Sequence, residues 1–252
     1  MLVYDTVKRE APQRPTRKAI FESGPRPGNF LVNKACNILV VANENPGDGE
    51  AEGRITVVRG IDADNPTTDI ISLDKSWDDD YLLRKGLHLP FTRNSLKYWD
   101  TWSPMADKID LSSDLDNYHS TLFLKPEYLA WDNEEETELL VNMQNNNGLT
   151  RVDMELNVTT SVASYGLKDH SYIPVDINSE DKDCDLQSYR NLFALRAPDT
   201  IVTVRYNDKT YVVTANEGSS EEYKDLTEEF EASELFDVSA VLALSDILFL
   251  AF

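Results

Sequence analysis

The residues of this chain that are best suited to chemistry are amides and carboxylates that follow short β-branched runs. Asn43-Glu44 follows ILVVA and Asn216-Glu217 follows YVVTA, and each pair precedes a polar segment with glycine and further acidic residues. Ca²⁺ takes six to eight oxygen ligands from carboxylates, amides and backbone carbonyls. We therefore predict that Asn43, Glu44, Asn216 and Glu217 bind Ca²⁺. The alternative is that each Asn caps a turn while each Glu faces solvent.

A second candidate cation site is the acidic segment DKDCD, in which Asp181, Asp183 and Asp185 alternate with other residues. Alternating carboxylates on a loop are able to converge on one cation. The segment is not an EF-hand, because the sixth residue from Asp181 is Leu186 rather than Gly and the twelfth is Leu192 rather than Glu. A calcium site and a solvated acidic loop both remain open here.

Consecutive acidic residues are less suited to binding one cation than alternating ones. Successive side chains on an extended strand point to opposite sides, so neighbouring carboxylates do not converge on one ion. The runs Asp78–Asp80 and Glu134–Glu136 are therefore predicted to be solvated turns.

Signatures of catalysis are absent from the sequence. It contains no GxSxG, HExxH, Walker A or GxGxxG pattern, and its three histidines, His88, His119 and His170, are scattered. We therefore expect a protein that is not an enzyme. A metal-dependent phosphoesterase-like hydrolase is the alternative, because metal-bridged carboxylates are able to activate water. An intracellular protein-binding scaffold is a further alternative.

The composition and net charge of the chain limit the classes of molecule that it would bind. The chain has 252 residues, 41% of them hydrophobic, and a formal net charge of −21. Such a surface repels phosphate backbones, so we expect no nucleic-acid binding, and it attracts divalent cations and basic proteins instead. Cys36 and Cys184 leave the disulfide state open. The apolar stretch Val238–Phe252 is short and interrupted by Asp246, so it gives no confident membrane span.

Three stretches, Ile38–Val58, Leu139–Met154 and Thr210–Tyr223, are variants of one unit, in which a β-branched run leads into a polar Asn/Gln/Glu patch. Repeated all-β units of this size are typical of propeller blades. Residues 127–166 have the pattern of one complete blade, with strands at 128–131, 138–143, 149–154 and 160–165. Two polar insertions, 74–120 and 168–190, interrupt the units, and short helices are expected in the first. The predicted fold is therefore all-β, a partial β-propeller with long loop insertions, with a β-sandwich as the alternative.

Several segments resemble one known family. Tyr211–Tyr223 (YVVTANEGSSEEY) is similar to the "LVTANEG…EY" segment of the choice-of-anchor I domain, a family that includes the mesenchyme-specific cell-surface glycoproteins of biomineralising animals. Leu122–Asp132 resembles "FLEPEYIAISPD", Leu139–Asp153 resembles "AYVTLQENNALAVVD", and Ile38–Val58 resembles "LLVANEGEP…EGSVSIID". The resemblance covers residues 1–236 and leaves residues 237–252 as an unmatched apolar tail.

The resemblance implies a seven-bladed propeller with YVTN- or WD40-like blades, of which this chain holds about half. It also implies an extracellular or cell-surface glycoprotein that binds Ca²⁺ and matrix or mineral partners in biomineralisation. This chain itself has no secretory signal at Met1. Asn157 begins an Asn-Val-Thr acceptor for N-glycosylation, which matters if the protein is secreted.

Overall fold

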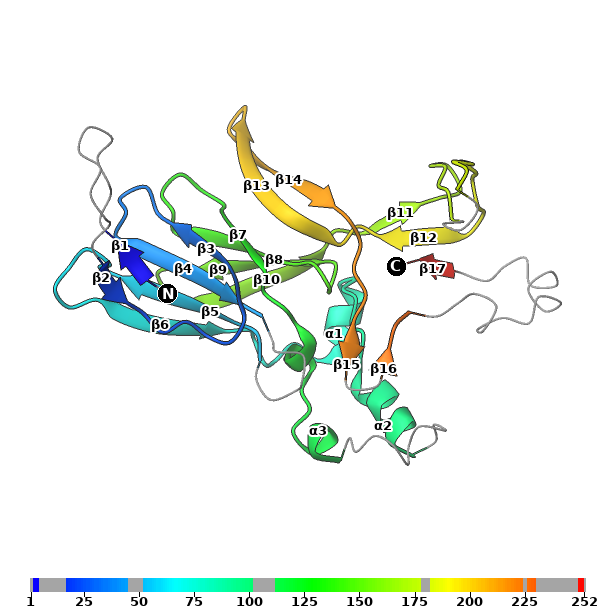
Figure 1. The fold of residues 1–252 in the computed structure, drawn as a ribbon, viewed down its shortest axis with the longest axis horizontal. Coiled ribbons are helices and arrows are strands. Elements are labelled where there is room, and N and C mark those ends of the chain that lie inside the picture. The colour runs from blue at the N-terminus through cyan, green and yellow to red at the C-terminus, as the bar shows by residue number, and fades with distance from the viewer. Residues whose placement is uncertain are drawn as a thin grey trace.

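The structure is a computed structural model that describes residues 2–4, 17–44, 52–101, 112–177, 182–223, 226–229 and 249–251. Strands dominate it, and they form several small, mostly antiparallel sheets (Figure 1). The prediction of an all-β chain is confirmed. In the described residues the sheets form an open stack that does not close into a ring.

Two four-stranded sheets are each built from consecutive strands. The first is β3 (Pro27–Val32), β4 (Ile38–Asn43), β5 (Arg54–Arg59) and β6 (Thr67–Ser72). The second is β7 (Tyr128–Trp131), β8 (Glu138–Met143), β9 (Gly148–Asp153) and β10 (Val158–Ser164). The inner strands β4 and β8 are buried on both faces, which explains why their apolar runs are continuous rather than alternating.

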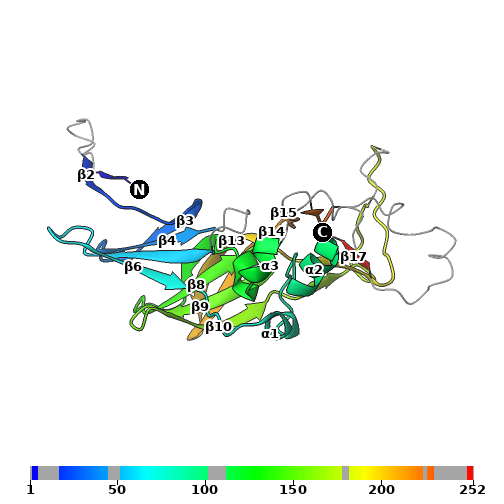
Figure 2. The ribbon, with the colours of Figure 1, turned by 90° about the horizontal axis from the view of Figure 1, so that it is seen from below.

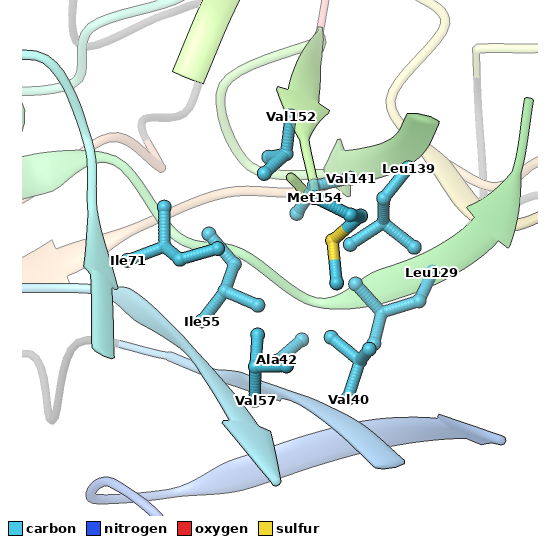
Figure 3. Packing of buried hydrophobic residues seen from close by; sticks show 10 residues of the cluster. All are labelled: Val40, Ala42, Ile55, Val57, Ile71, Leu129, Leu139, Val141, Val152 and Met154. Carbon is cyan, nitrogen blue, oxygen red and sulfur yellow. The ribbon is translucent and has the colours of Figure 1, made fainter. Parts of the chain in front are cut away.

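The two sheets pack face to face, and this contact is the main core of the molecule (Figure 3). Ten side chains from the two sheets meet there, none more than 3% exposed: Val40, Ala42, Ile55, Val57 and Ile71 from the first sheet, and Leu129, Leu139, Val141, Val152 and Met154 from the second. Burying such side chains is worth about 25 cal/mol per Å² of apolar surface. The contact between the sheets is therefore what fixes the position of their strand ends.

Apolar side chains from, or directly after, a hairpin pack on the outer face of each sheet. The first hairpin, β1 (Leu2–Tyr4) with β2 (Arg17–Ile20), leads into Phe21, which packs against Leu39 and Val41 of β4. The second, β13 (Pro198–Tyr206) with β14 (Lys209–Asn216), packs Ile201 against Leu140 of β8. Hairpin, sheet, sheet and hairpin thus follow one another in chain order (Figures 1 and 2).

The β13–β14 hairpin repeats the register of β3–β4. Pro27 lies opposite Asn43, and Pro198 lies opposite Asn216, and in both pairs the register shifts at the next residue. A proline has no N–H to give to the ladder, so it suits the start of a strand. The structure therefore gives Glu44 and Glu217 equivalent places at the ends of β4 and β14, and Gln144 holds the corresponding place after β8.

The first insertion contains short helices, as predicted: α1 (Asp79–Arg84), α2 (Arg93–Thr101), α3 (Ser112–Asp116) and the 3₁₀ helix η1 (Ser120–Phe123). It contributes Trp77, Leu82 and Leu87 to a second apolar cluster that reaches Met143 and Val162 of the second sheet. The insertion is thus packed on the sheet through a core of its own.

The prediction that Asp78–Asp80 is a solvated turn is wrong, because the run begins α1. The side chain of Asp78 accepts a hydrogen bond from the Tyr81 backbone N–H at 2.7 Å, which caps the helix. Asp79 accepts hydrogen bonds from the Arg93 backbone N–H and the Tyr118 hydroxyl. The carboxylates of Asp78 and Asp79 thus accept hydrogen bonds from backbone and side-chain groups within the first insertion.

The remaining strands are short. β11 (Leu167–Asp169), β12 (Leu192–Leu195) and β17 (Phe249–Ala251) form one sheet, and β15 (Glu222–Tyr223) pairs with β16 (Leu226–Thr227). Of the apolar tail at 237–252, only β17 is described, parallel to β12. Among the helices that the structure describes, none is long and apolar enough to cross a membrane.

Candidate functional site

The ends of β4, β8 and β14 are linked through polar side chains. Gln144, after β8, donates from Nε2 to Oε1 of Glu217 at 2.9 Å, and its backbone N–H donates to Oε2 of Glu127 at 3.3 Å. Glu44, after β4, lies close enough to Glu127 to act on it electrostatically. Two of the predicted calcium ligands, Glu44 and Glu217, are therefore connected through Glu127 and Gln144.

These strand ends open onto a polar cleft of about 670 Å³. Five carboxylates and two cationic side chains line it, together with amides and one tyrosine: Glu44, Glu127, Asp199, Glu221, Glu222, Arg26, Lys125, Gln144, Asn145 and Tyr128, beside Gly28. We call this the acidic cleft. Its excess of carboxylates favours a cationic ligand.

Glu127 is the most perturbed carboxyl in the acidic cleft. Burial raises its pKa from an ordinary 4.5 to about 8, and the negative charge of Glu44 adds to the increase. The hydrogen bond from the Gln144 backbone and the charge of Lys125 act in the opposite direction. Glu127 therefore holds a proton at neutral pH, which leaves four carboxylates against two cations in the cleft.

Glu221 lies at the buried wall of the same cleft and is 7% exposed. Its Oε2 is paired with the Lys125 ammonium group. Its Oε1 is buried and has no hydrogen-bond partner among the described residues. Burial raises the pKa of Glu221, although the contact with Lys125 opposes the increase. The cleft thus contains a carboxylate oxygen that is desolvated and free to accept a donor or a cation.

Gly28 in β3 allows the Glu44 carboxylate to lie against the strand. A Cβ atom at this position would come within 2.6 Å of Oε1 of Glu44. Arg26 holds the other oxygen of the carboxylate, with Nη2 at 3.9 Å from Oε2. Strand β3 therefore fixes the place of the Glu44 carboxylate at the edge of the cleft.

The two predicted asparagine ligands are separated from each other. Asn43 is fully buried and donates from Nδ2 to the carbonyls of Val41 and Arg54 and to the Thr56 hydroxyl. Asn216 is exposed and lines a different pocket, which it shares with Glu217 and His170. Asn43 therefore has the role of a buried polar group within the first sheet.

In the second unit the polar patch after β8 is largely structural. Asn146 is fully buried and donates to the carbonyls of His88 and Phe123, while its Oδ1 accepts from the Lys125 N–H. Asn147 is also buried, with its Oδ1 accepting from the backbones of Arg196 and Ala197. These amides join the second sheet to the segments around it.

The other predicted site residues are dispersed. Asp181 lies outside the described residues, and Asp183 and Asp185 are exposed. Asp185 accepts a hydrogen bond from Gln187 at 2.5 Å. Asn157 lies in the turn between β9 and β10 with a φ of 55° and accepts a hydrogen bond from Arg59 at 2.8 Å.

Sequence reasoning missed Glu127 and Lys125, and it found Glu221 only as one of the acidic residues that follow Asn216-Glu217. Lys125 and Glu221 are 96 positions apart, so no local pattern connects them. Two signals mark Glu127: its place directly before β7, beside a proline, and its position in Leu122–Asp132, the segment that resembles "FLEPEYIAISPD". Among the described residues, no three Asp, Glu, His or Cys side chains are grouped so that they alone would hold a metal ion.

Comparison with known families gives a match over nearly the whole chain. The model of the choice-of-anchor I domain matches residues 1–244. No curated protein matches the sequence.

Proposed function

The chain belongs to the choice-of-anchor I domain family, whose domains are associated with cell-surface proteins, and on that premise we propose that it is part of a non-enzymatic extracellular β-propeller. In this proposal the two four-stranded sheets are complete blades and β13–β14 is the inner half of a third. The support is that equivalent positions face the same way: Val40 contacts the second sheet, Leu140 contacts β13, and Val213 lies on the outward side of the hairpin.

We propose that the acidic cleft binds Ca²⁺. The observation that carries this proposal is the pair Glu44 and Glu127 in the acidic cleft: burial raises the pKa of Glu127, and the negative charge of Glu44 adds to the increase. A divalent cation between such groups relieves the repulsion and displaces the proton. At most two carboxylates would bind the ion, and amide, carbonyl and water oxygens would complete its six to eight ligands.

Titration calorimetry with Ca²⁺ at pH 8 tests the cleft. We expect binding by the wild-type chain, and at least about tenfold weaker binding for Glu44→Gln and Glu127→Gln, which corresponds to about 1.4 kcal/mol or more. Glu155→Gln, at the exposed turn between β9 and β10 and outside the lining of the cleft, is the control. An absence of heat at millimolar Ca²⁺, together with an unchanged melting temperature, would overturn the proposal.

The net charge of −21 supports a further part of the proposal, which is contact with basic matrix proteins or with a calcium mineral. Retention on a calcium phosphate column at rising ionic strength measures this contact, because added salt screens the attraction between exposed charges and weakens the binding. Retention equal to that of a neutral protein of the same size would contradict a role at mineral surfaces.

A further inference from the structure

The short sheet that contains β11 and β12 carries a pocket of about 690 Å³. Residues from the segment 173–177 and from the end of β14 at 216–218 complete its wall. We call it the β11–β12 pocket, and Figure 1 shows its sheet beyond the base of the β13–β14 hairpin. None of its lining residues belongs to the acidic cleft. Its volume is typical of small-molecule sites, so it is a candidate binding site of its own.

The register of β11 and β12 brings three nitrogen-bearing side chains to the pocket. Lys168 lies opposite Ala194, and the His170 backbone N–H donates to the Leu192 carbonyl, so the pairing continues past the end of β11. Opposed residues point to the same side of a sheet, and every second residue of a strand does so too. Lys168, His170 and Arg196 therefore share one face, and all three line the pocket.

His170 is the buried polar side chain of this pocket, at 4% exposure. Its Nδ1 lies 2.8 Å from the Ile173 carbonyl oxygen. Because a carbonyl only accepts, Nδ1 is the donor, and Nε2 of the neutral ring is left with a lone pair. Nε2 has no hydrogen-bond partner among the described residues. The ring therefore offers the pocket a fixed acceptor for a ligand N–H or O–H group.

Lys168 and Arg196 are cations without an acidic partner. The chain has 45 acidic and 24 basic residues, yet neither side chain forms an ion pair with an Asp or Glu among the described residues. Lys168 is half-buried, and Arg196 makes only a long contact, 3.5 Å, from Nη2 to the Leu167 carbonyl. A guanidinium and an ammonium group on one face are suited to a carboxylate.

Two carboxylates line the same pocket and balance these cations. Asp176 accepts a hydrogen bond from the Asp185 backbone N–H at 3.2 Å, and Glu217 accepts one from Gln144 at 2.9 Å, so each is held in place. With His170 neutral, the two cations and two carboxylates leave the lining with no net charge. A ligand that carries one positive and one negative group matches this wall better than a simple anion or cation does.

The rest of the wall is aliphatic. Ile173 and Ile177 are 45% and 59% exposed, so a ligand that covers them removes apolar surface from water. No aromatic side chain is among the lining residues that the structure describes. The other aliphatic members of the wall are Val175, Leu192, Ala194 and Leu195.

We propose that the β11–β12 pocket binds a small aliphatic zwitterion, of the kind that free leucine represents. In this proposal the ligand carboxylate contacts Lys168 and Arg196. The ligand ammonium group donates to Nε2 of His170 and is attracted by Asp176 and Glu217, while the alkyl chain packs on the aliphatic wall. Each polar group of the lining thus has a counterpart on the ligand, which is what orients a small molecule in a pocket.

Titration calorimetry of the full chain with L-leucine tests the pocket, and we expect a dissociation constant below about 1 mM. Two analogues separate the charges of the ligand. Isocaproate keeps the alkyl chain and the carboxylate but lacks the ammonium group, and isoamylamine keeps the alkyl chain and the ammonium group but lacks the carboxylate. Each should bind at least about tenfold more weakly than leucine, because one pair of charged groups in the pocket loses its counterpart.

Substitutions place the ligand in the pocket. Lys168→Met and Arg196→Met should each weaken leucine binding at least about tenfold. If the half-buried Lys168 does not tolerate the change, Arg196→Met still decides, because Arg196 is exposed and its backbone N–H keeps the hydrogen bond to Asn147. Arg190→Met is the matched control, since Arg190 is an exposed cation of the same insertion outside the lining.

Three results would each overturn the proposal. The first is an absence of leucine binding up to about 10 mM, ten times the expected constant. The second is equal binding of leucine and either analogue, which would mean that one charge is sufficient. The third is unchanged leucine binding by a folded Arg196→Met variant. None of these measurements depends on Ca²⁺ in the acidic cleft, so the two proposals fail or hold separately.

Discussion

Strands β4 and β14 have nearly the same sequence ending, VVAN and VVTAN, and opposite surroundings. Val40, Ala42 and Asn43 are completely buried, whereas Val213, Ala215 and Asn216 are exposed. Both strands pair with a partner that begins at a proline, and the register is the same. The difference lies in what packs on each strand: the second sheet covers one face of β4 and Phe21 packs on the other, whereas only one face of β14 has such a neighbour.

This contrast shows that the repeated sequence is sufficient to form the strand. How much the strand stabilises the fold depends on whether a neighbouring unit packs on its side chains. The same side chain is worth a few kcal/mol beneath a neighbouring sheet and close to nothing on an open face. Substitutions at matched positions therefore measure the contribution of the neighbour directly.

The largest effect of losing a packed side chain is expected at Leu140, the position of β8 that corresponds to Val213. Leu140→Ala should lower the free energy of unfolding by about 3 kcal/mol, since it leaves a cavity beneath Ile201 and Ala130. Val213→Ala should change it by less than about 0.5 kcal/mol. Urea denaturation measures both. Equal losses at the two positions would mean that the hairpin face is covered in solution.

The matched asparagines should differ by somewhat less. Asn43→Ala removes a donor from the carbonyls of Val41 and Arg54 and from the Thr56 hydroxyl, and should cost about 2 kcal/mol, because buried partners are left unpaired. Asn216→Ala should cost less than about 0.5 kcal/mol. Thermal unfolding gives the two values. A large loss for Asn216→Ala would show that its side chain has a buried partner in solution.

A pH-dependent effect on stability is expected in the acidic cleft. The pKa of Glu127 is about 8 in the folded chain and about 4.5 when unfolded, so the folded state binds the extra proton between these values. Stability contributed by this group is therefore lost as the pH rises from about 4.5 to about 8. Glu127→Gln removes the loss, and the variant should exceed the wild type by up to about 4 kcal/mol at pH 8 and match it near pH 4. A difference that does not vary with pH would contradict the burial of this carboxyl.

The smallest effect concerns the attachment of the hairpin. Thr203→Val removes the hydrogen bond to the Trp131 carbonyl and should cost about 1 kcal/mol. Val204→Thr, one residue further along on the open face, should be within about 0.5 kcal/mol of the wild type. Denaturation curves again give the comparison. A larger loss for Val204→Thr than for Thr203→Val would reverse the assignment of the two faces.

Strands were the most predictable part of this molecule. The predicted bounds of β7 and β8 agree with the structure, and those of β9 and β10 differ by two residues or fewer at each end. Their apolar, β-branched runs are bounded by turn residues, so local sequence is sufficient. The very short strands β15 and β16 were missed, because two residues carry no periodic pattern.

The acidic cleft was predictable only in part. Glu44 and Glu217 were identified from their equal places after a repeated strand, but only Glu44 lines the cleft, whereas Glu217 lines the neighbouring pocket and is linked to the cleft through Gln144. Asn43 has the same local pattern, but its burial depends on the partner strand β5 and on the packing of the first sheet. The contact of Lys125 with Glu221 depends on the path of the chain between them, which no spacing in the sequence reveals.

The chain-order succession of hairpin, sheet, sheet and hairpin has a consequence for unfolding. Because each layer contacts mainly the one before and the one after it, cooperativity passes only between nearest neighbours, as it does in solenoid proteins. The amides of β4 and β8, which have neighbours on both sides, should exchange with deuterium most slowly. Those of β14 should exchange first, in local openings that leave the paired sheets intact.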